Sequence, residues 1–173
     1  MPYHSRTDKK SQHRDDLTGE HQFGDRGQII FAGLFAAIWA SDSFALNYST
    51  FLNNDVPVGI RIPIGIIVLV LAAFLAGKGL HIVFGEKRVK PSVIQKSVFN
   101  VVRHPVYLGE ILLYLGLFAL NMSLAALGVC IAAAAFLHYI SRHEEKLLLE
   151  RFGEQYQQYM RRVPMWIPRI RQR

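Results

Sequence analysis

Four apolar runs limit what this chain can fold into. They cover residues 29–46, 62–84, 106–120 and 124–139, and polar segments separate them. A helix rises about 1.5 Å per residue, so a run of about 20 apolar residues crosses the ~30 Å hydrocarbon layer of a bilayer. The sequence therefore predicts an all-α, multi-pass transmembrane protein with about four membrane helices.

The last two runs are separated only by Asn121, Met122 and Ser123. So short a connection predicts a tight antiparallel helical hairpin. No helix-breaking residue follows until Gly153, so the last helix is expected to continue beyond the membrane. We expect residues 1–27 to form a polar N-terminal arm and residues 28–173 a single membrane domain.

The positions of lysine and arginine predict the orientation of this domain. Five lie in the arm, one (Arg61) between the first two runs, five in residues 85–106, none in the hairpin turn, and eight from residue 141 onward. Basic residues gather on the cytosolic side of membrane proteins. The arm, the loop and the tail are therefore expected in the cytosol. The net charge of +7 then reflects a surface beside anionic lipid, and no nucleic-acid partner is expected.

Two polar clusters are expected to meet on the cytosolic face. The first is R-H-P-V-Y-L-G at residues 103–109, where Pro105 can start a helix whose free N–H groups attract an anion. The second is Glu144-Glu145, on the cytosolic extension of the last helix. The hairpin returns the chain to the same face and so brings the clusters together. The alternative for the two glutamates is a solvated helix face with weak local ion pairs.

Other features allow two interpretations each. Asp42 is either an interfacial carboxylate beside serines or part of a substrate pathway. Gly77 and Gly79 are either a helix-packing device or a cofactor contact. Tyr156 and Tyr159 belong either to an interfacial aromatic anchor or to an amphipathic surface helix.

We find no pattern for metal, nucleotide-triphosphate or acyl-transfer chemistry. The histidines of the arm, His4, His13 and His21, lack the spacing of metal ligands. No metal site is therefore predicted.

The two clusters are followed by F-G-E-Q-Y-Q-Q-Y-M-R-R-V-P-x-x-I-P from Phe152. In this order and spacing, the motifs resemble the isoprenylcysteine carboxyl methyltransferase and phospholipid N-methyltransferase group of integral membrane enzymes, over about residues 85–170. The resemblance implies S-adenosylmethionine as cofactor, bound within about residues 85–168 on the cytosolic side. It also implies methyl transfer to a lipidic or other apolar acceptor: an isoprenoid, a phospholipid amine, a thiol or a carboxylate.

The same resemblance implies the site residues. His104 and Glu145 are the expected catalytic residues on chemical grounds, because an amine or thiol acceptor needs a base to remove its proton. Lys96 and Ser97 stand where the family has a small residue and a glycine. Ile140 replaces the substrate-binding arginine of carboxyl-methylating members, which weakens the case for a prenylated carboxylate acceptor. The expected cofactor-binding residues are Val93, Ile94, Gln95, Lys96, Ser97, Val98, Phe99, Arg103, His104, Pro105, Tyr107, Gly109, Glu144 and Glu145.

Two other function classes remain open at this point. Membrane sterol reductases end in a similar R-H-P-x-Y-x-G with a later V-P-x-x-I-P, and would bind NADPH. A non-catalytic membrane protein of the same fold is the third possibility, and the residues at positions 96, 97 and 140 motivate it.

Overall fold

The computed structural model describes residues 22–85 and 92–168. Most of the polar arm, including His4, His13 and His21, lies outside these ranges. The described residues contain helices and no strand, which confirms the all-α class. The five α-helices are α1 (Gln22–Ala40), α2 (Val58–Phe84), α3 (Pro105–Asn121), α4 (Leu124–Phe152) and α5 (Glu154–Arg162), and short helical turns cover η2 (Ser41–Leu46), η3 (Phe51–Asn54) and η4 (Ser97–Asn100).

The predicted helical hairpin is confirmed. Met122 ends α3 in the left-handed conformation, and the Ser123 hydroxyl accepts a hydrogen bond from the Ala126 N–H and so caps α4. α4 then continues without a break until Gly153, as predicted. By contrast, α1 begins at Gln22, inside the predicted arm, because polar residues on a first turn are compatible with a helix and Asp25 complements its dipole.

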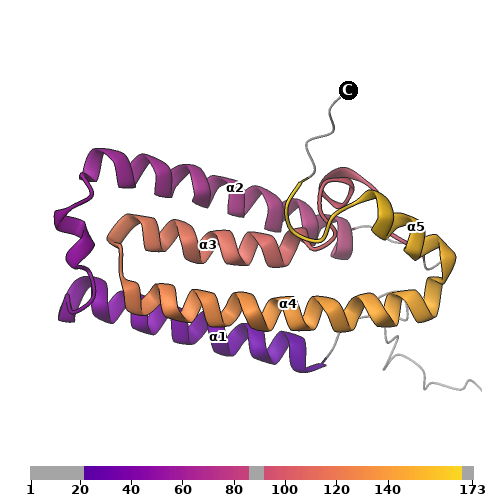
Figure 1. Cartoon of the computed structure of the whole chain (residues 1–173), viewed down its shortest axis with the longest axis horizontal. Helices are drawn as coiled ribbons and strands as arrows, with labels where there is room; N and C mark the ends of the chain where they lie inside the picture. The colour runs from indigo at the N-terminus through magenta and orange to yellow at the C-terminus, as the bar shows by residue number, and fades with distance from the viewer. Residues whose placement is uncertain (1–21, 86–91, 169–173) are drawn as a thin grey trace, which may run out of the picture.

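Within the described ranges, three helical segments are long and apolar enough to cross a membrane: Gly24–Leu46, Val58–Phe84 and Leu124–Phe152. α3 is shorter, with 17 residues, but it lies within the same bundle and runs from one end to the other (Figure 1). Large apolar side chains cover the outside of the helices, as expected for lipid contact. They include Ile30, Leu34, Ile66, Ile67, Val70, Phe74 and Ile131. The chain is therefore a multi-pass membrane protein.

Glycines allow α2 and α3 to pack closely along their length (Figure 1). A Cβ atom at Gly109 would lie 3.0 Å from the Ala72 carbonyl oxygen and 3.0 Å from the Ala76 backbone nitrogen. A Cβ at Gly79 would lie 2.7 Å from Val106 Cγ2. The interpretation of Gly79 as a packing residue is therefore confirmed, whereas Gly77 has no neighbour within 4 Å of an added Cβ.

Asp42 holds together the end of the bundle away from α5. Its carboxylate accepts hydrogen bonds from the backbone N–H groups of Tyr48 (2.9 Å) and Ser49 (3.0 Å) and from the hydroxyls of Ser49 and Ser123 (2.6 Å for Ser123). These bonds join the α1–α2 connection to the hairpin turn. The structure thus favours the serine-neighboured carboxylate over a substrate pathway.

The packing of Gly109 gives a first prediction. Gly109→Ala should lower the free energy of unfolding by about 1–3 kcal/mol, because the added methyl group meets the α2 backbone. The matched control is Gly128→Ala on α4, where an added Cβ has no neighbour within 4 Å. That change should be neutral or stabilising by up to about 1 kcal/mol. Thermal unfolding in detergent measures both, and equal midpoints for the two variants would contradict this account.

Candidate functional site

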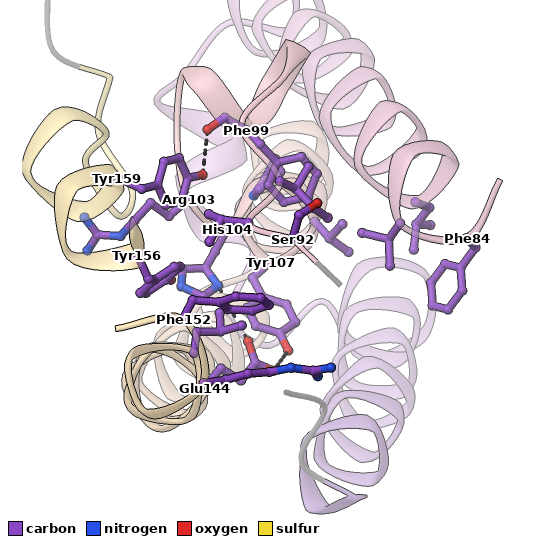
Figure 2. Close-up of a pocket in the computed structure, with 18 of the residues that line it drawn as sticks. Phe84, Ser92, Phe99, Arg103, His104, Tyr107, Glu144, Phe152, Tyr156 and Tyr159 are labelled. Carbon is purple, nitrogen blue, oxygen red and sulfur yellow. Dashed lines mark hydrogen bonds and ion pairs between the residues drawn. The ribbon is translucent and has the colours of Figure 1, made fainter. Parts of the chain in front are cut away.

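A cavity of about 340 Å³ opens at the end of the bundle where α3 begins and α4 extends beyond it (Figure 2). This volume lies within the range of small-molecule sites. The walls come from α1, the end of α2, the segment 92–99, the start of α3, the extension of α4, and α5. Six aromatic side chains lie in these walls: Phe84, Phe99, Tyr107, Phe152, Tyr156 and Tyr159.

The start of α3 is fixed locally by its sequence. Pro105 occupies the first turn, where its missing N–H is not needed, and the His104 carbonyl accepts the first helical hydrogen bond from Leu108 N–H at 3.0 Å. Before the helix, Val102 is fully buried. The side chains of His104 and Tyr107, at this end of α3, line the cavity. Their rings are parallel, with centroids 5.7 Å apart.

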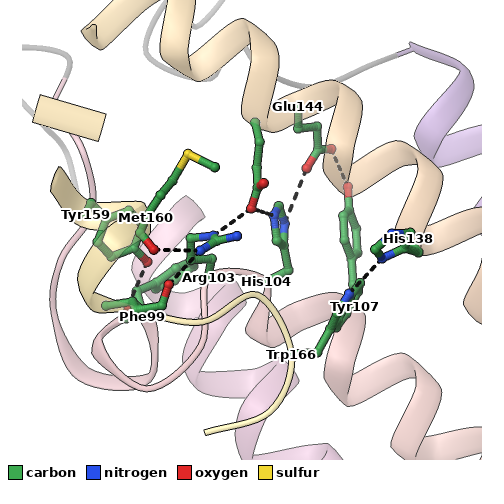
Figure 3. A network of polar contacts seen from close by, with 11 residues as sticks. Phe99, Arg103, His104, Tyr107, His138, Glu144, Tyr159, Met160 and Trp166 are labelled. Carbon is green, nitrogen blue, oxygen red and sulfur yellow. Dashed lines mark hydrogen bonds and ion pairs between the residues drawn. The ribbon is translucent and has the colours of Figure 1, made fainter. Parts of the chain in front are cut away.

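Arg103 fastens the C-terminal segment to the bundle (Figure 3). Its Nε donates to Glu145 Oε1 at 2.6 Å, and its Nη1 donates to the carbonyls of Met160 (3.1 Å) and Val163 (2.6 Å). Its backbone N–H donates to the Pro164 carbonyl at 3.0 Å. The guanidinium thus satisfies backbone acceptors left at the end of α5 and joins this segment to α4.

The two glutamates have different surroundings. Glu145 is 3% exposed and lies beside Arg103 and His104, whose Nε2 is 3.2 Å from Glu145 Oε1. Glu144 lines the cavity, accepts a hydrogen bond from the Tyr107 hydroxyl, and has its Oε2 3.7 Å from His104 Nδ1 (Figure 3). The imidazole therefore lies between two carboxylates, one facing the protein and one facing the cavity.

α5 packs its two tyrosines inward. Tyr156 and Tyr159 are buried beside Val163, and the Tyr159 hydroxyl donates to the Phe99 carbonyl at 2.6 Å. Burial raises the pKa of Tyr156 and of Tyr159 above the ordinary value for tyrosine, so both keep their phenolic protons at neutral pH. The structure favours the amphipathic surface helix over the interfacial aromatic anchor, since most other residues of α5 are exposed while the two tyrosines face inward and form part of the cavity wall.

The structure brings only part of the predicted cofactor residues to the cavity. Those that line it are Val93, Ile94, Phe99, Arg103, His104, Pro105, Tyr107 and Glu144. Those that do not line it are Gln95, Lys96, Ser97, Val98, Gly109 and Glu145. Val98 is buried against Leu75 and Ile82, and Gln95 accepts a hydrogen bond from Arg162. Gly109 packs on α2, and Glu145 reaches the cavity only through His104.

Ser97 keeps a backbone conformation that favours glycine. Its φ is 51°, in the left-handed region, at the start of η4. L-amino acids other than asparagine and aspartate rarely adopt this conformation without cost. The loop thus has the shape that the family's glycine at this position would favour, although the residue is serine.

Several cavity residues were missed by the sequence analysis. On α1 they are Asp25 and Gln28, placed in or beside the polar arm rather than in a site. Gln28 donates a hydrogen bond to Glu110 on α3 at 3.0 Å. No local motif marks these residues, since only the packing of α1 against the other helices brings them to the cavity. The others are Leu80, Val83, Phe84, Ser92, Val106, Leu148, Arg151, Phe152, Tyr156 and Tyr159.

Comparison with known families identifies this arrangement. The family model described as phospholipid methyltransferase matches residues 57–155, more than half of the chain. The match includes all of α2, α3 and α4, and with them His104, Tyr107 and both glutamates. The chain belongs to the phospholipid methyltransferase family.

Two relatives of this family member are methanethiol S-methyltransferases. That of Crocosphaera subtropica is 31% identical over 146 residues, which cover 83% of this chain and 48% of the relative. Methanethiol S-methyltransferase 2 of Bradyrhizobium diazoefficiens is 37% identical over 98 residues, 57% of this chain and 35% of the relative. The chain thus spans half or less of the length of the curated relatives it matches. No solved structure matches it significantly.

The contacts of Arg103 predict how the C-terminal segment is held. Arg103→Ala should expose the α5 region to trypsin at Arg161 and Arg162 about tenfold faster or more, because it leaves Glu145 buried without its cation. Arg142→Ala, at an exposed position of α4, is the control and should cleave like the unmodified protein. Timed proteolysis with mass spectrometry measures this, and equal rates for both variants would rule out the anchoring role.

The backbone of Ser97 gives a separate prediction. Ser97→Gly should raise the free energy of unfolding by about 1 kcal/mol, since glycine adopts a positive φ without steric cost. Asn100→Gly lies in the same turn without a positive φ and should lower it by up to about 1 kcal/mol. Denaturation in detergent distinguishes the two, and destabilisation by Ser97→Gly would show that the serine side chain matters more than its backbone.

Proposed function

We propose that this protein transfers a methyl group from S-adenosylmethionine to an apolar small-molecule acceptor. The observation that carries the proposal is the cavity between the start of α3 and the extension of α4, where Tyr107 and His104 meet Glu144 within the family-matched segment. The methyltransferase names of both relatives favour this activity over the reductase alternative.

The cavity suits the cofactor chemically. Its aromatic walls would stack on an adenine ring and attract a cation. Glu144 would hold the cofactor's ammonium group or ribose hydroxyls, and the N-terminal N–H groups of α3 would favour its carboxylate. Arg103 contributes less to that carboxylate than its charge suggests, because three of its contacts already go to Glu145, Met160 and Val163.

The protein's part in the reaction is alignment. S-adenosylmethionine supplies an electrophilic methyl group on a sulfonium ion, and displacement of that kind requires an in-line approach and little covalent help. Residues packed from five helices are suited to hold two ligands in one orientation. His104 remains the proposed base, because it lines the cavity and its Nδ1 lies 3.7 Å from Glu144 Oε2, which is beyond hydrogen-bond distance. Glu145 then acts as a positioning residue that orients the imidazole ring.

The acceptor is proposed to be neutral rather than a carboxylate. Ile140, which stands in place of an arginine, is 3% exposed and buried inside the protein. A small thiol is the best candidate, since both relatives are named for methanethiol.

We further propose that the cavity faces the cytosol and that the acceptor enters from the bilayer. The distribution of basic residues supports this orientation, because the cavity lies at the end of the bundle that carries the lysine- and arginine-rich segments. The lipid bilayer is then the environment of the protein, and no nucleic acid takes part.

Binding of S-adenosylhomocysteine to the detergent-purified protein tests the proposal. Glu144→Gln should raise the dissociation constant about tenfold or more, because it removes a charged acceptor from the cavity. Glu150→Gln, an exposed position of the same helix, should leave it unchanged. Absence of binding by the unmodified protein at millimolar S-adenosylmethionine would overturn the proposal.

A further inference from the structure

A polar pair links α1 to α3 beside the cavity. Gln28 Nε2 donates to Glu110 Oε2 at 3.0 Å, and the Tyr114 hydroxyl donates to Glu110 Oε1 at 2.5 Å. Each oxygen of the carboxylate thus receives one donor. Gln28 also lines the cavity, whereas Glu110 and Tyr114 are not part of its lining. α1 lies outside the segment 57–155 that the family model matches, so the family's shared residues do not account for this wall.

The contact with Glu110 fixes the orientation of the Gln28 amide. In the structure the NH₂ group of the Gln28 amide is the end that faces Glu110, which also accepts from the Tyr114 hydroxyl. The Gln28 carbonyl oxygen is then directed away from Glu110. Because Gln28 is part of the cavity wall, this oxygen is placed to accept a hydrogen bond from a ligand in the cavity.

The charge of this wall restricts the ligand. Asp25 precedes Gln28 by three residues, so the two lie on one face of α1, and both line the cavity. This face therefore presents a carboxylate and an amide oxygen. Such a wall repels a carboxylate and favours a group that carries a proton on sulfur, nitrogen or oxygen, and the names of the two relatives favour sulfur among these.

We infer that Gln28, held by Glu110, is the residue that orients the methyl acceptor, and that the acceptor is a short, neutral molecule with an S–H group. This inference rests on the proposed function and assigns its acceptor side to α1. In the reaction, the acceptor sulfur forms a bond to the methyl carbon as the carbon–sulfonium bond breaks, and the thiol proton leaves to His104 or to water. Glu110 is a positioning residue, because it touches Gln28 and lies outside the cavity lining.

A purely structural role is the competing explanation, since the same contact also fastens α1 to α3. Trp39 provides the comparison. Its Nε1 donates to the Leu117 carbonyl on α3 at 3.0 Å, and it does not line the cavity. If Gln28 only fastens α1, then Gln28→Met and Trp39→Phe should change activity alike.

The experiment measures methylation of ethanethiol, with S-adenosylhomocysteine affinity and thermal unfolding as readouts that do not depend on turnover. Gln28→Met should raise the KM for ethanethiol about three- to tenfold, the effect of one lost neutral hydrogen bond, with kcat and cofactor affinity changed less than about twofold. Glu110→Leu should do the same. Trp39→Phe should leave that KM unchanged.

A double variant keeps the test valid if single changes weaken the bundle. Gln28→Glu combined with Glu110→Gln reverses the pair and retains a hydrogen bond between α1 and α3. It places a carboxylate on the cavity wall, so it should unfold near the temperature of the unmodified protein and bind butylammonium more tightly, measured as competitive inhibition of ethanethiol methylation. Unchanged inhibition by butylammonium with normal folding would overturn the role of Gln28.

The remaining outcomes separate this inference from the proposed function. If the unmodified protein binds S-adenosylhomocysteine but methylates hexanoate and no thiol, the assignment of the acceptor is wrong while the cofactor site stands. A Gln28→Met variant that loses cofactor affinity together with thiol affinity would place Gln28 on the cofactor side and also overturn the inference. If the unmodified protein binds no cofactor, the proposed function itself fails.

Discussion

The ion pair between Arg103 and Glu145 is the interaction on which the site depends. It joins three parts of the chain, the start of α3, the extension of α4 and the segment after α5, at an N–O distance of 2.6 Å with both side chains nearly buried. Two charges at so low an exposure are stable only when paired and further hydrogen-bonded. The backbone carbonyls of Met160 and Val163 and the ring of His104 provide those additional contacts. The motif arginine therefore assembles the site more than it contacts a ligand.

Two sets of contacts within the bundle determine where the Arg103–Glu145 pair lies. The glycine contacts of α3 with α2 fix how deeply α3 lies, and the hydrogen bonds of Asp42 fix the far end of the hairpin. Because α4 is continuous from this turn to Phe152, the turn also determines where Glu144 and Glu145 arrive. Small residues serve this purpose well in a membrane, where helix association relies on close packing rather than on the hydrophobic effect.

The neighbouring residues Glu144 and Glu145 therefore have different roles. Successive residues of a helix point about 100° apart, so Glu145 turns into the protein toward Arg103 while Glu144 turns toward the cavity and Tyr107. His104 lies between them and connects the fixed network to the ligand site. A cavity built in this way has a rigid inner wall, and its chemistry is set by groups whose orientation is already determined.

The sequence by itself determined the helices, the hairpin, the break at Gly153 and the pairing of R-H-P-x-Y with the two glutamates, because length, apolar content and turn residues act locally. It also predicted Val93, Ile94, Phe99 and Tyr107 at the cavity through the family resemblance. Only the tertiary structure decided which glutamate faces the cavity, that Val98 and Gly109 serve packing, and that Tyr156 and Tyr159 turn inward. Only it revealed Asp25 and Gln28. The reason is physical: the direction in which a helix face points depends on its neighbours, and those neighbours are distant in the chain.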